Sequence, residues 1–92
     1  MSQHFFERTI DGQLRHVQIG WDKPLQHFYC NIIGIDGPDG ILYSNLFEFE
    51  KRSLDYYVDK CKDFGIELPE GLYEEVLTDQ QNNVVNRVEW WD

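Results

Sequence analysis

In the first part of the chain, apolar and polar residues alternate in the way expected of strands that bury one face. The alternation begins at His4 and stops at Ile10, where Asp11-Gly12 is a strong signal for a two-residue hairpin turn. Pairing Ile10 with Gln13 places large apolar side chains together on one face, which we expect to be the core face. Those side chains are Phe6, Ile10, Val17, Ile19 and Trp21. A slip of the register by one residue would exchange the two faces.

Two further strands are predicted beyond the break at Asp22-Lys23-Pro24, where proline removes a backbone donor. The first covers residues 25–36, and its buried side stays open between two alternatives. One side carries Phe28, Cys30 and Ile32, and the other carries Tyr29, Ile33 and Ile35. After a turn over residues 37–40, a fourth strand covers residues 41–45, and residues 46–50 are a candidate extension of it.

After Ser53 the apolar period changes from two to about 3.6 residues, which indicates a helix. Its apolar positions are Leu54, Tyr57, Val58, Cys61 and Phe64. Ser53 is a good N-cap, and Gly65 followed by Ile66 is a good C-terminal stop. A second helix is predicted over residues 69–81, because Pro69 suits a first turn. Its apolar stripe is Leu72, Tyr73, Val76 and Leu77.

A last strand over residues 84–91 closes the chain, with Val84, Val88 and Trp90 on one side. The predicted order is therefore β-β-β-β-α-α-β. Short hairpin links make neighbouring strands antiparallel, and the helices then cover one face of the sheet. We predict a single α+β domain over residues 1–92, in two layers: an antiparallel sheet of about five strands covered on one face by two helices.

The chain is strongly acidic, with a net charge of −9, and between Asp63 and Asp79 it contains neither Lys nor Arg. This argues against a protein that grips nucleic acid phosphates or an anionic membrane, because such surfaces need clustered basic residues. We predict an acidic face for a protein partner, although solubility explains the same pattern. The residues of this face are Glu67, Glu70, Glu74, Glu75 and Asp79. The like charges four residues apart slightly weaken the helix, which hints that the face has a use.

Aromatic residues make up 15% of the chain, and a core this small can leave some of them exposed. Adjacent residues on a strand point opposite ways, so Trp90 and Trp91 cannot both enter one core. We therefore predict an aromatic contact surface, because Trp and Tyr dominate the energetics of interfaces. Its candidate residues are Trp21, Trp91, Phe5 and Tyr29. A ligand groove and a small cluster under the C-terminal tail are the alternatives.

The sequence predicts no metal site and no cofactor. His27 and Cys30 have a spacing that suggests metal ligands, but positions three apart on a strand point to opposite faces. His4 and His16 also fall on opposite faces of the predicted hairpin.

No catalytic residue is predicted either. His16 lies opposite Glu7, which suits a general base with its orienting carboxylate, but an exposed pair contributing about 0.2–1 kcal/mol is the simpler interpretation. Ser44 and Ser53 lack the sequence context of a nucleophilic serine. Cys61 lies on an apolar helix stripe, where a thiol is usually inert.

Cys30 and Cys61 are far apart in the sequence and suggest neither a disulfide scaffold nor a zinc finger. The first residues lack the basic and long apolar regions of a signal peptide, and no segment approaches about eighteen apolar residues. We therefore expect a soluble, cytoplasmic protein with reduced thiols.

Several segments together resemble a group of small, uncharacterised bacterial proteins of about this length. They are GWDKPLQHFY at residues 20–29, LYSNL at residues 42–46, FGIELP at residues 64–69, and NRV at residues 86–88. The resemblance extends over most of the chain and implies a bacterial, cytoplasmic, single-domain protein. It carries no activity and no site residue.

Three functions fit these patterns. The leading hypothesis is a non-enzymatic protein-interaction module, either a homodimer or a binder of a basic partner whose complex weakens steeply with salt. The second is an immunity or inhibitor protein whose acidic helical face takes the place of nucleic acid, with Glu70, Glu74 and Glu75 in contact. The third is a small ligand-binding protein or enzyme that uses the aromatic face with His16 or His27. The sequence names no reaction and no substrate.

Overall fold

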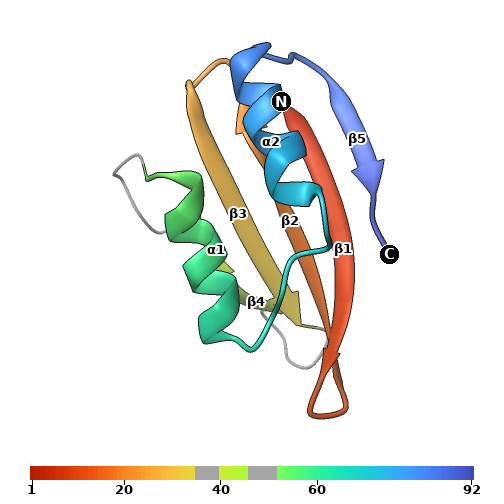
Figure 1. The fold of residues 1–92 in the computed structure, drawn as a ribbon. Coiled ribbons are helices and arrows are strands. Elements are labelled where there is room, and N and C mark those ends of the chain that lie inside the picture. Colours follow the sequence, from red (N-terminus) through yellow and green to blue (C-terminus); the bar gives the residue numbers. More distant parts are fainter. Residues whose placement is uncertain (35–39, 46–51) are drawn as a thin grey trace.

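The fold has two layers, a five-stranded sheet and a pair of helices that cover one of its faces (Figure 1). The structure is a computed structural model, and it describes residues 1–34, 40–45 and 52–92. The strands are β1 (Ser2–Ile10), β2 (Gln13–Asp22), β3 (His27–Gly34), β4 (Ile41–Ser44) and β5 (Arg87–Trp90). The helices are α1 (Leu54–Asp63) and α2 (Leu72–Gln81). The predicted α+β class and order of elements are confirmed.

The first hairpin forms in the predicted register. Ile10 pairs with Gln13, and Phe6 pairs with Val17. Asp11 and Gly12 have positive φ values of 53° and 78°, as the tight turn requires. Phe6 and Val17 are both 1% exposed, so the core face of the hairpin is the predicted one.

Pairing with β2 decides which side of β3 is buried. Cys30 lies opposite Ile19, and directly paired residues share a face of the sheet, so Phe28, Cys30 and Ile32 point into the core. β3 begins later than predicted, because residues 23–26 form a turn in which Gln26 has a φ of 52°. The predicted strand positions 35 and 36, and the candidate extension over residues 46–50, lie outside the described residues.

The sheet order is β4-β3-β2-β1-β5, and the last pairing differs from the others. β5 runs parallel to β1, with Ser2 opposite Arg87 and Phe5 opposite Trp90. α2 carries the chain back to the end of the sheet at which β1 starts, so β5 leaves in the same direction as β1 (Figure 1). Short hairpin links predict antiparallel neighbours throughout the sheet. The prediction does not hold for β5, because a helix rather than a hairpin turn precedes it.

The two helices end where local chemistry places their caps. The side chain of Ser53 accepts a hydrogen bond from the N–H of Tyr56 at 3.2 Å and so caps α1. After α1, Gly65 has a φ of 76°, and the N–H of Ile66 returns to the carbonyl oxygen of Cys61 at 2.9 Å. α2 begins at Leu72 rather than at residue 69, because the left-handed Gly71 interrupts the chain before it.

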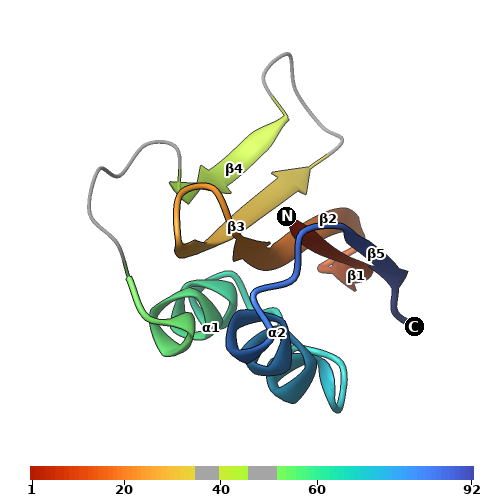
Figure 2. The same ribbon diagram turned by 90° about the horizontal axis from the view of Figure 1, so that it is seen from above.

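The core lies between the helices and the sheet, and both helices lie on the same side of it (Figure 2). The thiols of Cys30 on β3 and Cys61 on α1 meet there in a hydrogen bond, with their sulfur atoms 3.9 Å apart and not joined in a disulfide. The hydrogen bond to Cys61 and burial raise the pKa of Cys30. Cys30 therefore stays a protonated thiol and acts as a small apolar side chain.

Candidate functional site

The face of the sheet opposite the helices carries no covering layer among the described elements (Figure 2). We call it the open face. Side chains reach it from alternate positions of the strands, as the pairing registers require. They include Phe5, Glu7, His16, Gln18, Asp22, His27, Tyr29, Asn31, Ser44, Val88 and Trp90.

A row of polar side chains crosses four strands of the open face. Gln18 on β2 donates to Gln3 on β1 at 3.5 Å and accepts from the amide nitrogen of Asn31 on β3 at 3.2 Å. The hydroxyl of Ser44 on β4 donates to the amide oxygen of Asn31 at 2.6 Å. Because the members of the row bond one another, the row fixes this part of the face and leaves little of its hydrogen-bonding capacity for a ligand.

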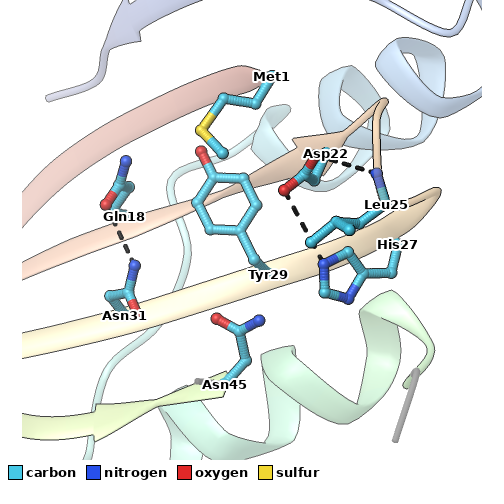
Figure 3. Close-up of a pocket in the computed structure, with 8 residues that line it drawn as sticks. All are labelled: Met1, Gln18, Asp22, Leu25, His27, Tyr29, Asn31 and Asn45. Carbon is cyan, nitrogen blue, oxygen red and sulfur yellow. Dashed lines mark hydrogen bonds and ion pairs between the residues drawn. The ribbon is translucent and has the colours of Figure 1, made fainter. Parts of the chain in front are cut away.

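Beside this row the open face is hollowed next to the turn at residues 23–26 (Figure 3). The hollow has a volume of about 230 Å³. Its lining residues are Met1, Gln18, Asp22, Leu25, His27, Tyr29, Asn31 and Asn45. Pockets for drug-sized ligands usually have volumes of about 300–1,000 Å³, so this one suits a small molecule or a single side chain of a partner.

The packing around Tyr29, which lines the hollow, depends on the absence of a side chain at Gly20. A Cβ atom at Gly20 would lie 2.1 Å from the carbonyl oxygen of Ser2 and 3.0 Å from the hydroxyl of Tyr29. Because Gly20 has no side chain, the carbonyl group of Ser2 can lie close to it. The Tyr29 hydroxyl donates a hydrogen bond to the same carbonyl oxygen at 2.6 Å. Burial raises the pKa of Tyr29, so its hydroxyl stays protonated and keeps this bond.

Asp22 and His27 form the polar rim of the hollow. One carboxylate oxygen of Asp22 accepts from the N–H of Leu25 at 3.3 Å, and the other lies 4.0 Å from Nε2 of His27. This pair offers a negative charge and an imidazole, which suit binding a small polar group. Among the described residues that line the hollow there is no Ser, Thr, Cys or Lys, so none of them offers a side-chain nucleophile of those types to pair with this imidazole.

A second His–carboxylate pair lies on the helix-covered side of the sheet. Nε2 of His4 on β1 lies 2.6 Å from Asp79 on α2, and both side chains are almost fully buried. The indole N–H of Trp91 donates to Nδ1 of His4 at 3.0 Å. An indole nitrogen can only donate, so Nδ1 accepts and Nε2 carries the proton given to Asp79. Arg87 on β5 donates to the other carboxylate oxygen of Asp79 at 2.8 Å.

The electrostatics of this buried network favour a charged Asp79. Burial acts to raise the pKa of Asp79, but hydrogen bonds from His4, Ser2 and Arg87 outweigh burial and hold the pKa below its ordinary value. Both ring nitrogens of His4 and both carboxylate oxygens of Asp79 have partners. The network therefore joins β1, α2 and β5, and it engages the ring nitrogens of His4 and the carboxylate oxygens of Asp79 within the fold.

The structure separates the four aromatic candidates of the sequence. Trp21 is 4% exposed in the core, and the ring of Trp91 packs toward α2 near Gly71. Tyr29 is on the open face but is 6% exposed. Phe5 is half-buried on the open face, where it stacks on Trp90 at 4.6 Å with an interplanar angle of 21°.

The candidate acidic face is also divided. Glu67, Glu70 and Glu74 are exposed on the helical side of the molecule. Glu75 is half-buried and lies 3.1 Å from Arg87, while Asp79 is 0% exposed. Asp79 therefore does not belong to a surface, because it is turned inward to bind His4.

The remaining candidates lie where strand geometry placed them. His27 is on the open face and Cys30 is in the core, and His4 and His16 also lie on opposite faces. Nδ1 of His16 lies 3.1 Å from Glu7, with both side chains well exposed. Within residues 1–34, 40–45 and 52–92, no three His, Cys, Asp or Glu side chains gather as metal ligands.

Sequence reasoning missed the buried network, although signals for it existed, and it did not include Trp90 in the aromatic surface. Asp79 follows Leu72 and Val76 at helical spacing, so it belongs to the apolar stripe of α2, and His4 alternates with Phe6 on the core face. A buried carboxylate and a buried histidine both need hydrogen-bond partners, so their positions on two buried faces predict that they pair. Trp90 is the outward member of the Trp90-Trp91 pair and is 70% exposed.

No family model matches the chain, and no curated protein or solved structure shows significant similarity to it. Among the described residues, no helix has the length and apolar character needed to cross a membrane. The bacterial resemblance stays a prediction.

Proposed function

We propose that this protein is a non-enzymatic protein-interaction module that forms a homodimer through the part of the open face beside β5. The observation that carries the proposal is the stacked pair of Phe5 and Trp90, with Trp90 70% exposed on a face that no described element covers. A large aromatic side chain that is already held in place gains much contact area on binding and loses little conformational freedom.

Neighbouring side chains extend this pair into a patch. Val88 is 58% exposed and lies on the same face one position along the pleat, and Val85 is 51% exposed just before the strand. Single exposed apolar residues are common on soluble proteins, whereas a group of them that includes a tryptophan is typical of a contact site.

The distribution of charge supports a second copy of the chain as the partner. Each copy carries a net charge of −9, so association must keep the acidic regions apart. The exposed carboxylates Glu67, Glu70 and Glu74 belong to the helical layer, on the other side of the sheet from Trp90 (Figure 2). A dimer that uses the open face beside β5 therefore leaves these carboxylates in water.

Sedimentation equilibrium over micromolar to millimolar concentrations tests the proposal. We expect a species of twice 11.0 kDa that loses at least about tenfold in affinity when Trp90 is changed to Ser. Ile41→Ser is the matched control, because Ile41 is 50% exposed on β4 at the other edge of the sheet. A protein that stays monomeric throughout, or a dimer that tolerates Trp90→Ser, contradicts the proposal.

Binding of a small polar ligand in the hollow is the second candidate function. The hollow of about 230 Å³, with Asp22 and His27 at its rim, favours it. Native mass spectrometry of gently purified protein tests it: a retained small molecule that is lost in Asp22→Asn would support binding. A mass equal to that of the bare chain or its multiples would contradict it.

A further inference from the structure

β5 is an edge strand, with β1 on one side and no described strand on the other. β1 uses alternate backbone groups of this segment. The N–H of Arg87 donates to the carbonyl oxygen of Met1 at 3.4 Å, and that of Trp91 donates to Phe5 at 2.8 Å. In a parallel ladder, every second residue points its N–H and C=O at the neighbouring strand. The backbone groups of the residues in between point away from the sheet.

The strand residues that point their backbone groups outward are Val88 and Trp90. Such unpaired groups form a template for another strand, and natural edges are often protected by a very short strand, charged side chains, Pro, a bulge or a covering element. β5 has four residues and carries Arg87 and Glu89, but it contains neither Lys nor Pro, and no described element lies along its free edge (Figure 1). The edge is thus open to pairing, and its outward residues are the exposed ones of the proposed contact patch.

We propose that the free edge of β5 pairs antiparallel with β5 of a second copy of this chain, about a twofold axis beside Val88. The two sheets then form one continuous sheet by strand addition. This inference rests on the proposed function, since it names how the homodimer is built.

The direction in which the backbone N–H and C=O groups point restricts the register of such a pair. Hydrogen bonds across an antiparallel pair form between residues whose groups point at each other. Residues that point outward must therefore face residues that also point outward. Val88 can face Asn86, Val88 or Trp90 of the second copy, and registers shifted by one residue are excluded.

Charge then selects one of the three registers. When Val88 faces Val88, Arg87 of each copy lies opposite Glu89 of the other. When Val88 faces Trp90, the two Glu89 side chains face each other, and when it faces Asn86, the two Arg87 side chains do. Like charges directly opposite destabilise a sheet, whereas opposite charges stabilise it. The register with Val88 on the axis is the one that the charges of β5 favour.

The contacts on both sides of the joined sheet are compatible with this register. On the helix-covered side, Arg87 is already held by Asp79 at 2.8 Å and lies 3.5 Å from Glu89 of its own strand. Its position is therefore fixed by the fold before Glu89 of the second copy approaches. On the open face, Val88 of the two copies meet at the axis, and the stack of Phe5 and Trp90 flanks them on either side.

A proline at the axis tests the backbone part of the proposal. Val88→Pro removes an outward N–H that the monomer does not use, and edge strands tolerate proline there. We expect the dissociation constant of the dimer to rise at least about tenfold, while the circular dichroism spectrum of the monomer is unchanged. Val88→Thr is the matched control, because it keeps both the N–H and the β-branched shape, and its dimer should persist.

A charge substitution covers the case in which Val88→Pro does not fold. Glu89→Lys places two basic residues opposite each other in the chosen register, at a position that is about half exposed. We expect it to weaken the dimer severalfold and to leave the monomer folded. A dimer of unchanged affinity in this variant would overturn the selected register.

Cross-linking locates the axis directly. Val88→Cys places two thiols opposite each other across the twofold, and diamide, a disulfide-forming oxidant, should link them into a covalent dimer. Val85→Cys is the matched control. Val85 is 51% exposed, but with Val88 on the axis it lies far from Val85 of the second copy. Cys30 and Cys61 are buried and should not react.

The outcomes separate the two proposals. A dimer that depends on Trp90 but resists Val88→Pro and is not linked through Val88→Cys would overturn edge pairing and leave the interaction module standing, with its open faces stacked instead. A protein that stays monomeric at millimolar concentration would overturn both. Linkage through Val88→Cys but not Val85→Cys, together with loss of the dimer in Val88→Pro, would establish the edge pair.

Discussion

Both faces of the sheet carry histidines beside carboxylates, and the buried pair on the covered face differs from the exposed pair at His16 on the open face. On the covered face, His4 and Asp79 lie 2.6 Å apart with almost no exposure. On the open face, His16 and Glu7 lie 3.1 Å apart with side chains 38% and 48% exposed. Each pair joins an imidazole to a carboxylate, so the difference comes mainly from burial and from the other partners of each pair.

Burial turns the covered pair into a structural requirement. Asp79 cannot exchange His4 and Arg87 for water, because α2 and the sheet enclose it. Glu7 loses little when His16 moves away, because water replaces the imidazole at once. Substitutions in the covered pair should therefore change stability, and substitutions of exposed side chains on the open face should change association or almost nothing.

Asp79→Ala should have the largest effect on stability. It leaves the N–H of His4 without its acceptor and Arg87 without its closest carboxylate, and breaking a buried pair in this way costs about 3–5 kcal/mol. Chemical denaturation measures the loss. Glu75→Gln is the control, because Glu75 contacts the same Arg87 from a half-exposed position and its loss should cost less than about 1 kcal/mol. Equal losses in the two variants would show that burial does not decide the value of the pair.

Lowering the pH should remove the stability that ionised Asp79 contributes to the wild-type protein, without any substitution. Although burial opposes ionisation, the partners of Asp79 hold its pKa below the ordinary 3.8, so its charge stabilises the fold fully above about pH 4. That stability is lost as the pH falls through the lowered pKa. The wild type and Asp79→Asn should therefore differ most at pH 6 and converge toward pH 2. A constant difference in unfolding free energy over this range would contradict the assignment.

Gly20→Ala should show that part of the open face is also closely packed. Alanine usually stabilises a strand relative to glycine, but here its Cβ would meet the Ser2 carbonyl oxygen at 2.1 Å. We expect a loss of about 1–3 kcal/mol, as for other overpacked sites. Gly34→Ala is the control, since its nearest neighbour is a flexible Arg15 nitrogen at 3.1 Å. A Gly20→Ala protein as stable as the wild type would remove the argument that the packing around Tyr29 depends on Gly20.

The sequence predicted the fold because most of its signals were local. The Asp11-Gly12 turn set the hairpin register, and Ser53 and Gly65 set the ends of α1. The buried side of β3 was left open, because it depends on pairing with β2, which is not local. β5 was predicted as a strand, but its parallel pairing follows from the direction in which α2 returns the chain.

The candidate site was harder to predict, because it depends on contacts between distant residues. Asp79 was assigned to an acidic surface on charge alone, although its helical spacing to Val76 pointed inward. Trp91 was chosen over Trp90, since nothing in their order tells which one meets His4. Charge and aromatic content predict that the chain has acidic and aromatic contact residues. Which of those residues lie at the surface depends on burial in the folded chain.

The smallest effect is expected at the exposed pair. His16→Gln removes the imidazole beside Glu7 and should lower the free energy of unfolding by about 0.2–1 kcal/mol, the usual value of an exposed cross-strand pair. His4→Gln is its counterpart on the covered face, and it should cost several times more, because it breaks the bonds to both Asp79 and Trp91. Denaturation of Glu7→Gln, of His16→Gln and of the double variant measures the coupling energy of Glu7 and His16 directly, and denaturation of His4→Gln supplies the comparison. A coupling energy for Glu7 and His16 as large as the His4→Gln loss would mean that the open face holds a structured site, and the contrast between the two faces would fail.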